Sequence, residues 1–327
     1  MAKRKTTTLK KHVKRKVNKA RNKHKIINVL VIVLFLLVAA YFYYDSLNQQ
    51  QNFNYSIEQN SEGYYYYQTE SDQYYEEAQN LVDEALKSKL HTILNTNFVP
   101  RSYADAKTVL VESDVNPNDP SKLIGIYDNT EIDSVWNGTI WNREHVWPNS
   151  RLGIERVSES TKNIGTDLHN LRAIESRINS TRSNHYYVNG SGIGHKTADG
   201  FYPGDDHKGD VARILLYMAT MYDYLKVADE GFDEGQTYTN SMVTMGKLSL
   251  LLDWHKQDPV DEFERHRNQV IYEAQGNRNP YIDRPEFVHI IWENKTIEAL
   301  LKPVETTEEV MSMPTFRVVT FYQTFIQ

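Results

Sequence analysis

Apolar residues form one continuous block near the N-terminus and several shorter periodic segments further along the chain. The block at 26–44 has nineteen residues, which at about 1.5 Å each give a helix of roughly 28 Å, close to the thickness of a bilayer core. Residues 1–25 carry twelve Lys or Arg and no acidic residue. The pattern predicts a basic cytoplasmic tail and a transmembrane signal-anchor, which place everything after Tyr44 outside the cell membrane. The alternative is a secreted protein, released by signal-peptide cleavage near Ala40.

Polar residues dominate 45–73, which is rich in Gln, Asn, Ser and Tyr and lacks apolar periodicity. This composition predicts a flexible, low-complexity linker. Beyond the linker, apolar residues recur three and four positions apart, which is typical of amphipathic helices. The predicted helices cover 74–95, 103–112, 211–225, 241–255, 259–276 and 285–292.

Strand signals are fewer. Asn and Pro residues at 114–120 predict a turn, and the apolar run at 123–127 then predicts a buried strand. A second strand is expected at 141–147, ended by Pro148. The tail 294–327 ends in a strand-like run, and the sequence suggests no role for it. We therefore expect a helix-rich α+β domain at 74–293.

Charge is distributed unevenly. The formal net charge of −6 includes the basic leader, and without it the chain holds 25 basic and 43 acidic residues, a net of −18. The stretch 141–215 is the exception, with ten basic and nine acidic residues. Any attraction to nucleic acid must therefore be local. The chain has no cysteine, which excludes disulfides, thiolate metal sites and cysteine nucleophiles.

The stretch 141–184 concentrates groups suited to cleaving a phosphodiester. A neutral imidazole, here His145, can take a proton from water near neutral pH. The carboxylate of Glu144 and the amide oxygen of Asn179 suit a hard cation such as Mg²⁺, which keeps only a few protein ligands. A nearby arginine could bind the phosphate through two parallel hydrogen bonds.

Simpler interpretations exist for each residue taken alone. A Glu-His pair is most often a surface ion pair or a buried, satisfied histidine, and a single Asn is most often a helix cap. Neighbouring side chains on a regular strand also point to opposite faces, so Glu144 and His145 can share a site only where the strand ends or bulges.

The ordered set of motifs resembles the endonuclease I family, exported bacterial nucleases with a His-Me finger (ββα-metal) core. The resemblance is closest to the cysteine-free extracellular nucleases of Gram-positive bacteria, and it spans about 74–293. The motifs are Trp141 to Ser150, Asp167 to Arg172, Asn179-x-x-Arg182-x-Asn184, Lys208 to Arg213, Trp254 to Val260 and Gln275 to Asp283.

The resemblance implies a role for each matched residue. His145 would be the general base, and Glu144 and Asn179 would bind Mg²⁺, or Mn²⁺ or Ca²⁺ in its place. Arg151 is our candidate for the arginine that steadies the phosphate, and the weaker candidates for substrate contact are Arg143, Arg172 and Arg182.

The implied activity is non-specific endonuclease cleavage of DNA or RNA that leaves 5′-phosphate ends. The implied partners are the nucleic-acid substrate and the membrane, with no obligate protein partner. Two other functions stay open, a different metal-dependent phosphoesterase and a non-catalytic nucleic-acid-binding protein on the same scaffold.

Overall fold

The computed structural model describes residues 31–34, 36–38, 57–70, 73–230 and 243–303. Most of the predicted transmembrane segment 26–44, the basic leader 1–25 and the tail 304–327 lie outside the described residues. Within the described parts, no helix combines the length and apolar composition needed to span a bilayer.

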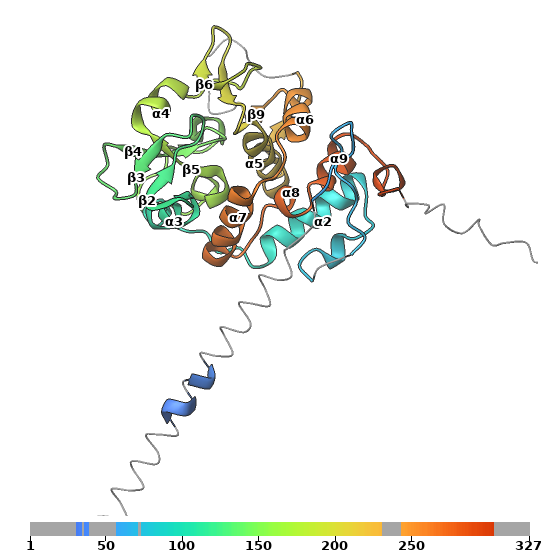
Figure 1. The fold of residues 1–327 in the computed structure, drawn as a ribbon, viewed down its shortest axis with the longest axis horizontal. Coiled ribbons are helices and arrows are strands. Elements are labelled where there is room, and N and C mark those ends of the chain that lie inside the picture. Colours follow the sequence, from blue (N-terminus) through green and yellow to red (C-terminus); the bar gives the residue numbers. More distant parts are fainter. Residues whose placement is uncertain (1–30, 35, 39–56, 71–72, 231–242, 304–327) are drawn as a thin grey trace, which may run out of the picture.

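A buried central helix organises the domain. In α5 (Lys208–Met221), every residue from Gly209 onward is buried, and α5 packs against α6 and α2. Figure 1 shows α5 in the middle, with strands β2 to β5 on one side and α2, α8 and α9 on the other. The remaining α-helices are α2 (Asp83–Thr96), α3 (Ala106–Ser113), α4 (Ser176–Arg182), α6 (Leu248–Gln257), α7 (Glu262–Gln275), α8 (Pro280–Asp283) and α9 (Glu286–Trp292).

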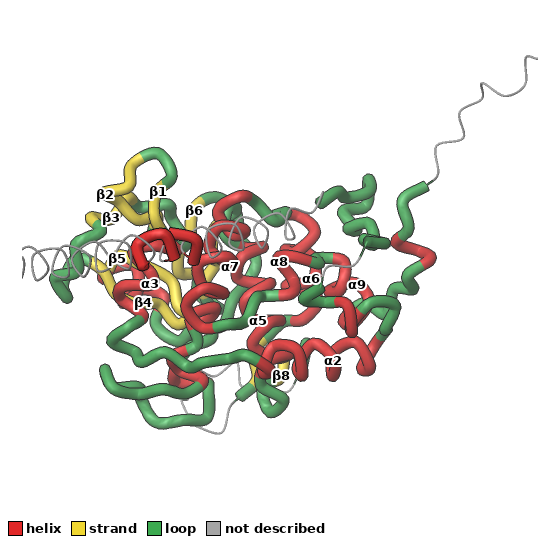
Figure 2. Tube along the Cα trace, turned by 90° about the horizontal axis from the view of Figure 1, so that it is seen from below, coloured by secondary structure: helices red, strands yellow, loops and turns green. Residues whose placement is uncertain are grey.

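The strands are short and form small separate sheets, which lie mostly at one end of the molecule (Figure 2). β1 (Val115–Asn116), β2 (Asp119–Ile124) and β3 (Glu131–Asp133) form an antiparallel sheet, as do β4 (Trp141–His145) with β5 (Leu171–Glu175) and β6 (Ile193–Lys196) with β7 (Phe201–Gly204). β8 (Lys226–Val227) and β9 (Thr244–Met245) pair in parallel. The expected mixed, helix-rich fold is therefore present, with more strands than the sequence predicted.

Two hydrophobic clusters hold these elements. The larger surrounds α5 and takes in α2, α6, α9 and the β6–β7 hairpin. The smaller lies between α3, α7 and one face of β4–β5, around Trp141, Leu168 and Leu171. The β4–β5 pair thus stands between two cores, which fixes its position.

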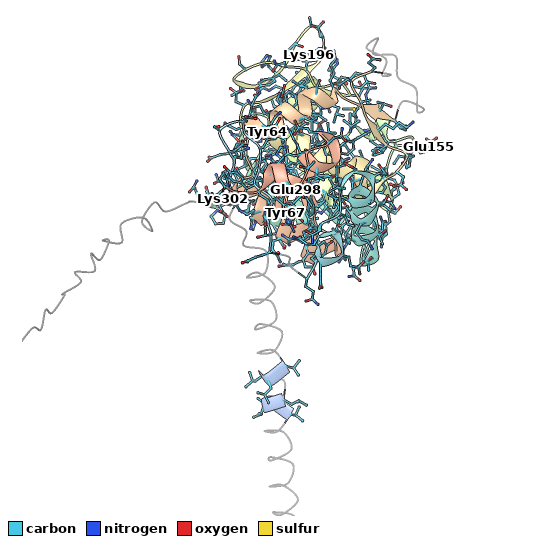
Figure 3. The ribbon with its side chains drawn as sticks, turned by 90° about the vertical axis from the view of Figure 1, so that its right-hand side faces the viewer. Tyr64, Tyr67, Glu155, Lys196, Glu298 and Lys302 are labelled. Carbon is cyan, nitrogen blue, oxygen red and sulfur yellow. The ribbon has the colours of Figure 1, made fainter. Side chains whose placement is uncertain are left out.

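The linker prediction is wrong for 57–70, which packs on the domain. Tyr65 is buried, and its backbone N–H donates to His289 Nε2 at 3.0 Å. The backbone N–H of Tyr67 donates to Leu300 O at 2.7 Å, and Figure 3 shows Tyr67 together with Glu298 and Lys302. Tyrosines fill this part of the core, so a search for aliphatic periodicity misses it. The predicted boundary at 293 is also too early, since Leu300 is buried.

Helix boundaries shift where capping differs from the expected pattern. The helix predicted at 74–95 begins only at Asp83, after a short 3₁₀ turn at Glu76–Ala78. α7 is capped by Asp261, whose side chain accepts from Glu264 N at 2.8 Å, and Gly276 ends it in the left-handed region. Asp258, the expected cap of α7, instead accepts from Gly209 N at the start of α5.

The turn predicted at 114–120 is narrower than expected. It lies between β1 and β2, whose residues occupy most of that range. The hairpin β6–β7 was not predicted, because its glycines and its exposed outer face leave little apolar alternation.

Candidate active site

The site is built on a strand pair followed by a short helix, in the order that the sequence predicted. β4 and β5 run antiparallel, with Glu144 opposite Arg172 and His145 opposite Leu171. α4 follows β5 directly and carries Asn179. This is the strand–strand–helix arrangement of a ββα unit.

β4 ends at His145, and beyond it the side chain of Asn170 pairs the backbone groups that a neighbouring strand would otherwise pair. Asn170 Oδ1 accepts from Trp147 N at 2.7 Å, and Asn170 Nδ2 donates to Trp147 O at 3.0 Å. Asn170 O also accepts from Val146 N. Since buried backbone groups must be paired, Asn170 allows the chain to leave the sheet immediately after His145.

An open cleft of about 990 Å³ lies over this strand end. Glu144, His145 and Asn179 all line it, so the structure brings together the three residues predicted to carry the chemistry. Within the described residues, no cluster of three or more His, Asp or Glu side chains is placed to hold a metal.

His145 is held as a specific tautomer. Its Nε2 lies 2.7 Å from Gly165 O, so this nitrogen carries the proton and donates it to the carbonyl. Nδ1 is left as the acceptor, and it has no hydrogen-bond partner in the described chain. Burial lowers the pKa of His145 to about 4, the Gly165 bond opposes this shift, and the charges of Arg143 and Arg156 add to it. The ring is therefore a neutral base at neutral pH.

Gly165, whose carbonyl accepts from His145, is closely packed. A Cβ at this position would lie 2.5 Å from Val157 Cγ1 and 2.9 Å from Ile154 Cδ1. A side chain here would therefore force Val157 and Ile154, or the Gly165 backbone, to shift.

One carboxylate oxygen of Glu144 is contacted by two side chains of the protein. Tyr127 OH donates to Oε1 at 2.8 Å, and Arg182 Nε lies 3.1 Å from the same oxygen. Oε2 makes no hydrogen bond within the described part of the chain. Burial raises the pKa of Glu144 to about 7, although Arg182 and Tyr127 favour the charged form. A bound cation would favour that form further.

Asn179 offers a free amide. It is half-buried on the cleft wall, and its side chain makes no hydrogen bond to any described residue. Glu144 Oε2 and the Asn179 amide oxygen are hard oxygen donors, so the residues present fit Mg²⁺ or a similar cation.

Of the predicted phosphate contacts, Arg143 lines the cleft but is already paired. It forms an ion pair of 2.8 Å with Glu159 and donates to Tyr103 O. Arg151, the first candidate, does not line the cleft. Its guanidinium donates to Asn184 O at 3.0 Å and to Tyr186 OH at 2.7 Å.

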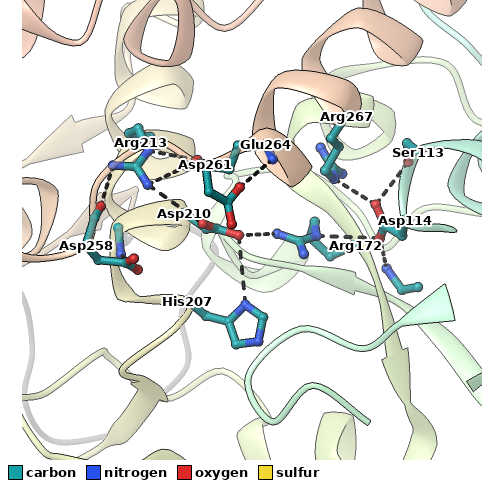
Figure 4. Close-up of polar contacts among 12 residues, drawn as sticks. Ser113, Asp114, Arg172, His207, Asp210, Arg213, Asp258, Asp261, Glu264 and Arg267 are labelled. Atoms are coloured by element: carbon teal, nitrogen blue, oxygen red, sulfur yellow. Dashed lines mark hydrogen bonds and ion pairs between the residues drawn. The ribbon is translucent and has the colours of Figure 1, made fainter. Parts of the chain in front are cut away.

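Arg172 and Arg182 are buried and serve the scaffold, contrary to the substrate-contact prediction. Arg182 supports Glu144 and donates to Val146 O at 3.0 Å. Arg172 lies 2.8 Å from Asp210 and 3.5 Å from Asp114, in the network of Figure 4 that joins β5 to α5 and α7. The sequence could not separate these roles, because a buried pairing arginine and a substrate-binding arginine look alike in one dimension.

Two groups of the site were not predicted from the sequence. Arg156 is exposed on the cleft wall and close enough to lower the pKa of His145. Tyr127 lies in the loop after β2 and donates a hydrogen bond to Glu144. Nothing in the sequence distinguishes it from a tyrosine that only packs in the core. For Arg156, the only available signal was its place in the polar loop after His145.

Comparison with known proteins shows what this chain is similar to. The family model described as Endonuclease I matches residues 82–286. The chain is 40% identical over 237 residues to an extracellular ribonuclease of Bacillus subtilis (strain 168), covering 68% of this chain and 79% of that protein. An extracellular ribonuclease of Bacillus amyloliquefaciens is 38% identical over the same shares. Endonuclease-1 of Buchnera aphidicola is 29% identical over 36% of this chain and 46% of its own. The family prediction is confirmed: the chain belongs to the endonuclease I family, in its Gram-positive extracellular branch.

Proposed function

We propose that this protein is a divalent-cation-dependent nuclease that hydrolyses phosphodiester bonds in RNA, DNA or both. The observation that carries the proposal is the cleft shared by His145, Glu144 and Asn179. Nδ1 of His145, Oε2 of Glu144 and the Asn179 amide have no hydrogen-bond partners among the described residues. The names of the Bacillus relatives support RNA as a substrate.

In the proposed mechanism, His145 Nδ1 takes a proton from the attacking water while Nε2–H stays on Gly165 O. Glu144 and Asn179 would hold the cation, which when bound neutralises charge on the phosphoryl oxygens. The attack displaces the 3′ oxygen and leaves a 5′-phosphate. Arg156, exposed on the cleft wall, is better placed than Arg151 to contact the phosphate.

The decisive assay incubates the full-length protein with plasmid DNA and with structured RNA, in Mg²⁺ and in EDTA. We expect cleavage only with the cation, and we expect Asn179→Ala to need a higher Mg²⁺ concentration for half-maximal rate. Cleavage that persists in EDTA would refute the cation dependence. Binding without cleavage in any divalent cation would favour a non-catalytic binding protein, and cleavage of only small phosphodiesters would favour another phosphoesterase.

We also propose that residues 26–44 export the nuclease domain. They act either as a membrane anchor or as a signal peptide cleaved near Ala40. The N-terminal mass of the mature protein and its recovery in membrane or medium distinguish the two routes.

A further inference from the structure

The cleft continues away from the proposed chemistry onto a second wall, formed by Tyr103, Trp136, Arg143 and Glu159. We propose that this wall is a subsite for an unpaired nucleobase next to the scissile phosphate, so that the enzyme prefers single-stranded substrate. The inference rests on the proposed nuclease function and names the substrate form that the same site takes.

The wall is a layer of aromatic and cationic groups that starts at the general base. The rings of Tyr103 and His145 are nearly parallel, at 28°, with centroids 5.5 Å apart. The guanidinium carbon of Arg143 lies 3.4 Å from the centre of the Tyr103 ring and 5.2 Å from that of Trp136. A nucleotide whose phosphate is at His145 therefore has this wall as its neighbour.

The cations beside this wall are only partly neutralised within the protein. Glu159 pairs with Arg143 and with Lys107, at 2.8 Å in both cases. These pairs lower the pKa of Glu159 to about 2, so the carboxylate stays charged. Because one carboxylate offsets two cations, one positive charge remains beside the rings, and cationic groups next to aromatic rings are the combination that binds single strands.

Trp136 has features that its packing alone does not explain. Its edge-on contact with Trp141, at 4.6 Å and 87°, anchors it to the smaller core, yet the side chain stays half-buried and lines the cleft. Its indole N–H has no hydrogen-bond partner in the described chain. An accessible indole beside a phosphodiester site can stack on a base and donate one hydrogen bond.

Stacking of this kind requires a base that has left its own helix. In a duplex the bases are paired and stacked on one another, and only a single strand can turn one against a protein ring. The net charge of −18 after the leader also disfavours a duplex, which carries more phosphates per unit length than a single strand.

The test measures binding in the His145→Ala background, where cleavage does not interfere. The probes are a fluorescein-labelled oligoribonucleotide and an abasic ribose-phosphate oligomer of equal length and charge, with Ca²⁺ present. Because one stacked base contributes about 1–3 kcal/mol, we expect the base-bearing probe to bind roughly tenfold more tightly. Trp136→Leu keeps apolar bulk against Trp141 and should remove this difference, whereas Trp136→Phe should keep most of it.

Val135→Ala is the matched control, since Val135 is on the same loop, is 70% exposed and does not line the cleft. It should bind both probes as the parent does. The inference is overturned if Trp136→Leu weakens both probes equally, or changes neither. It is also overturned if wild-type enzyme cleaves duplex and single strands equally and Trp136→Leu leaves that ratio unchanged. If the wild-type enzyme cleaves neither substrate form but the base-bearing probe still binds more tightly, the result counts against the proposed function and not against the subsite.

Discussion

The phenol oxygen of Tyr127 lies 2.8 Å from Glu144 Oε1 and 2.7 Å from the hydroxyl of Tyr187. Tyr127 is buried, and its backbone has a φ of +85°, a region that bulky residues rarely adopt. Gly194 N donates to its carbonyl at 2.7 Å, and a Cβ on Gly204 would lie 2.6 Å from the same oxygen. The β6–β7 hairpin therefore fixes an unfavourable backbone conformation that orients the proposed metal ligand.

Tyr127→Phe should weaken the cation site without changing the fold. The ring remains, but Glu144 loses one of the two groups that orient Oε1. Loss of a group that orients a metal ligand typically costs 10–100-fold in affinity, so we expect about tenfold more Mg²⁺ for half-maximal cleavage. Tyr224→Phe, which removes a hydroxyl that donates to Leu152 O, is the control. An unchanged Mg²⁺ requirement in Tyr127→Phe would contradict this positioning role.

Arg182→Met should destabilise the protein strongly. Its guanidinium is fully buried against Glu144, and removing one partner of a buried ion pair costs about 3–5 kcal/mol. Adding Glu144→Gln to Arg182→Met should recover part of the loss, because no charge is then left unpaired. Urea denaturation of the two single variants and the double variant measures this coupling. Strictly additive effects would show that the pair does not interact.

Asn170→Ala should lower activity as well as stability. It orphans the backbone N–H and C=O of Trp147, and each buried unpaired group costs about 1–3 kcal/mol. The backbone that follows His145 would then no longer be held where it leaves the sheet. The temperature of thermal unfolding and kcat should both fall. Asn95→Ala, on the exposed face of α2, should change neither. Normal kcat in a destabilised Asn170→Ala variant would mean that the hydrogen bonds of Asn170 do not position His145.

Stability should fall in acid through His169. Burial lowers the pKa of His169 to about 3, although a bond to Asn277 O opposes the shift. The unfolded chain binds this proton first, so the contribution is complete above pH ~6.5 and decreases towards pH ~3, by about 1.4 kcal/mol per unit. The stability advantage of wild type over His169→Gln should shrink by about 2 kcal/mol between pH 8 and 5.

Thr220→Val provides the control for that titration, because Thr220 is buried and does not titrate. Its difference from wild type should not depend on pH. An equally constant difference for His169→Gln would show that His169 is not held neutral.

The order of the site could be predicted from sequence because its parts are local. Pro148 predicted a strand end close to His145, where β4 does end, and Ser176 to Arg182 is long enough for the turn that carries Asn179. The arginines could not be assigned, since their roles depend on contacts far apart in the chain. Arg172, for example, meets Asp210 across 38 positions.

The same limit explains the errors at the domain edges. The segment 57–70 is polar in composition, yet it contacts residues 190 or more positions away, such as His255 and His289. Only the folded chain shows that its tyrosines belong to the core.

The most direct test of the central claim compares His145→Ala with His195→Ala in Mg²⁺, on plasmid DNA and on RNA. Both remove one imidazole, but His195 is exposed on β6 and does not line the cleft. Because a positioned general base contributes about 10²–10⁴-fold, we predict a loss of that size for His145→Ala and wild-type rates for His195→Ala. Wild-type cleavage by a folded His145→Ala protein would contradict the account.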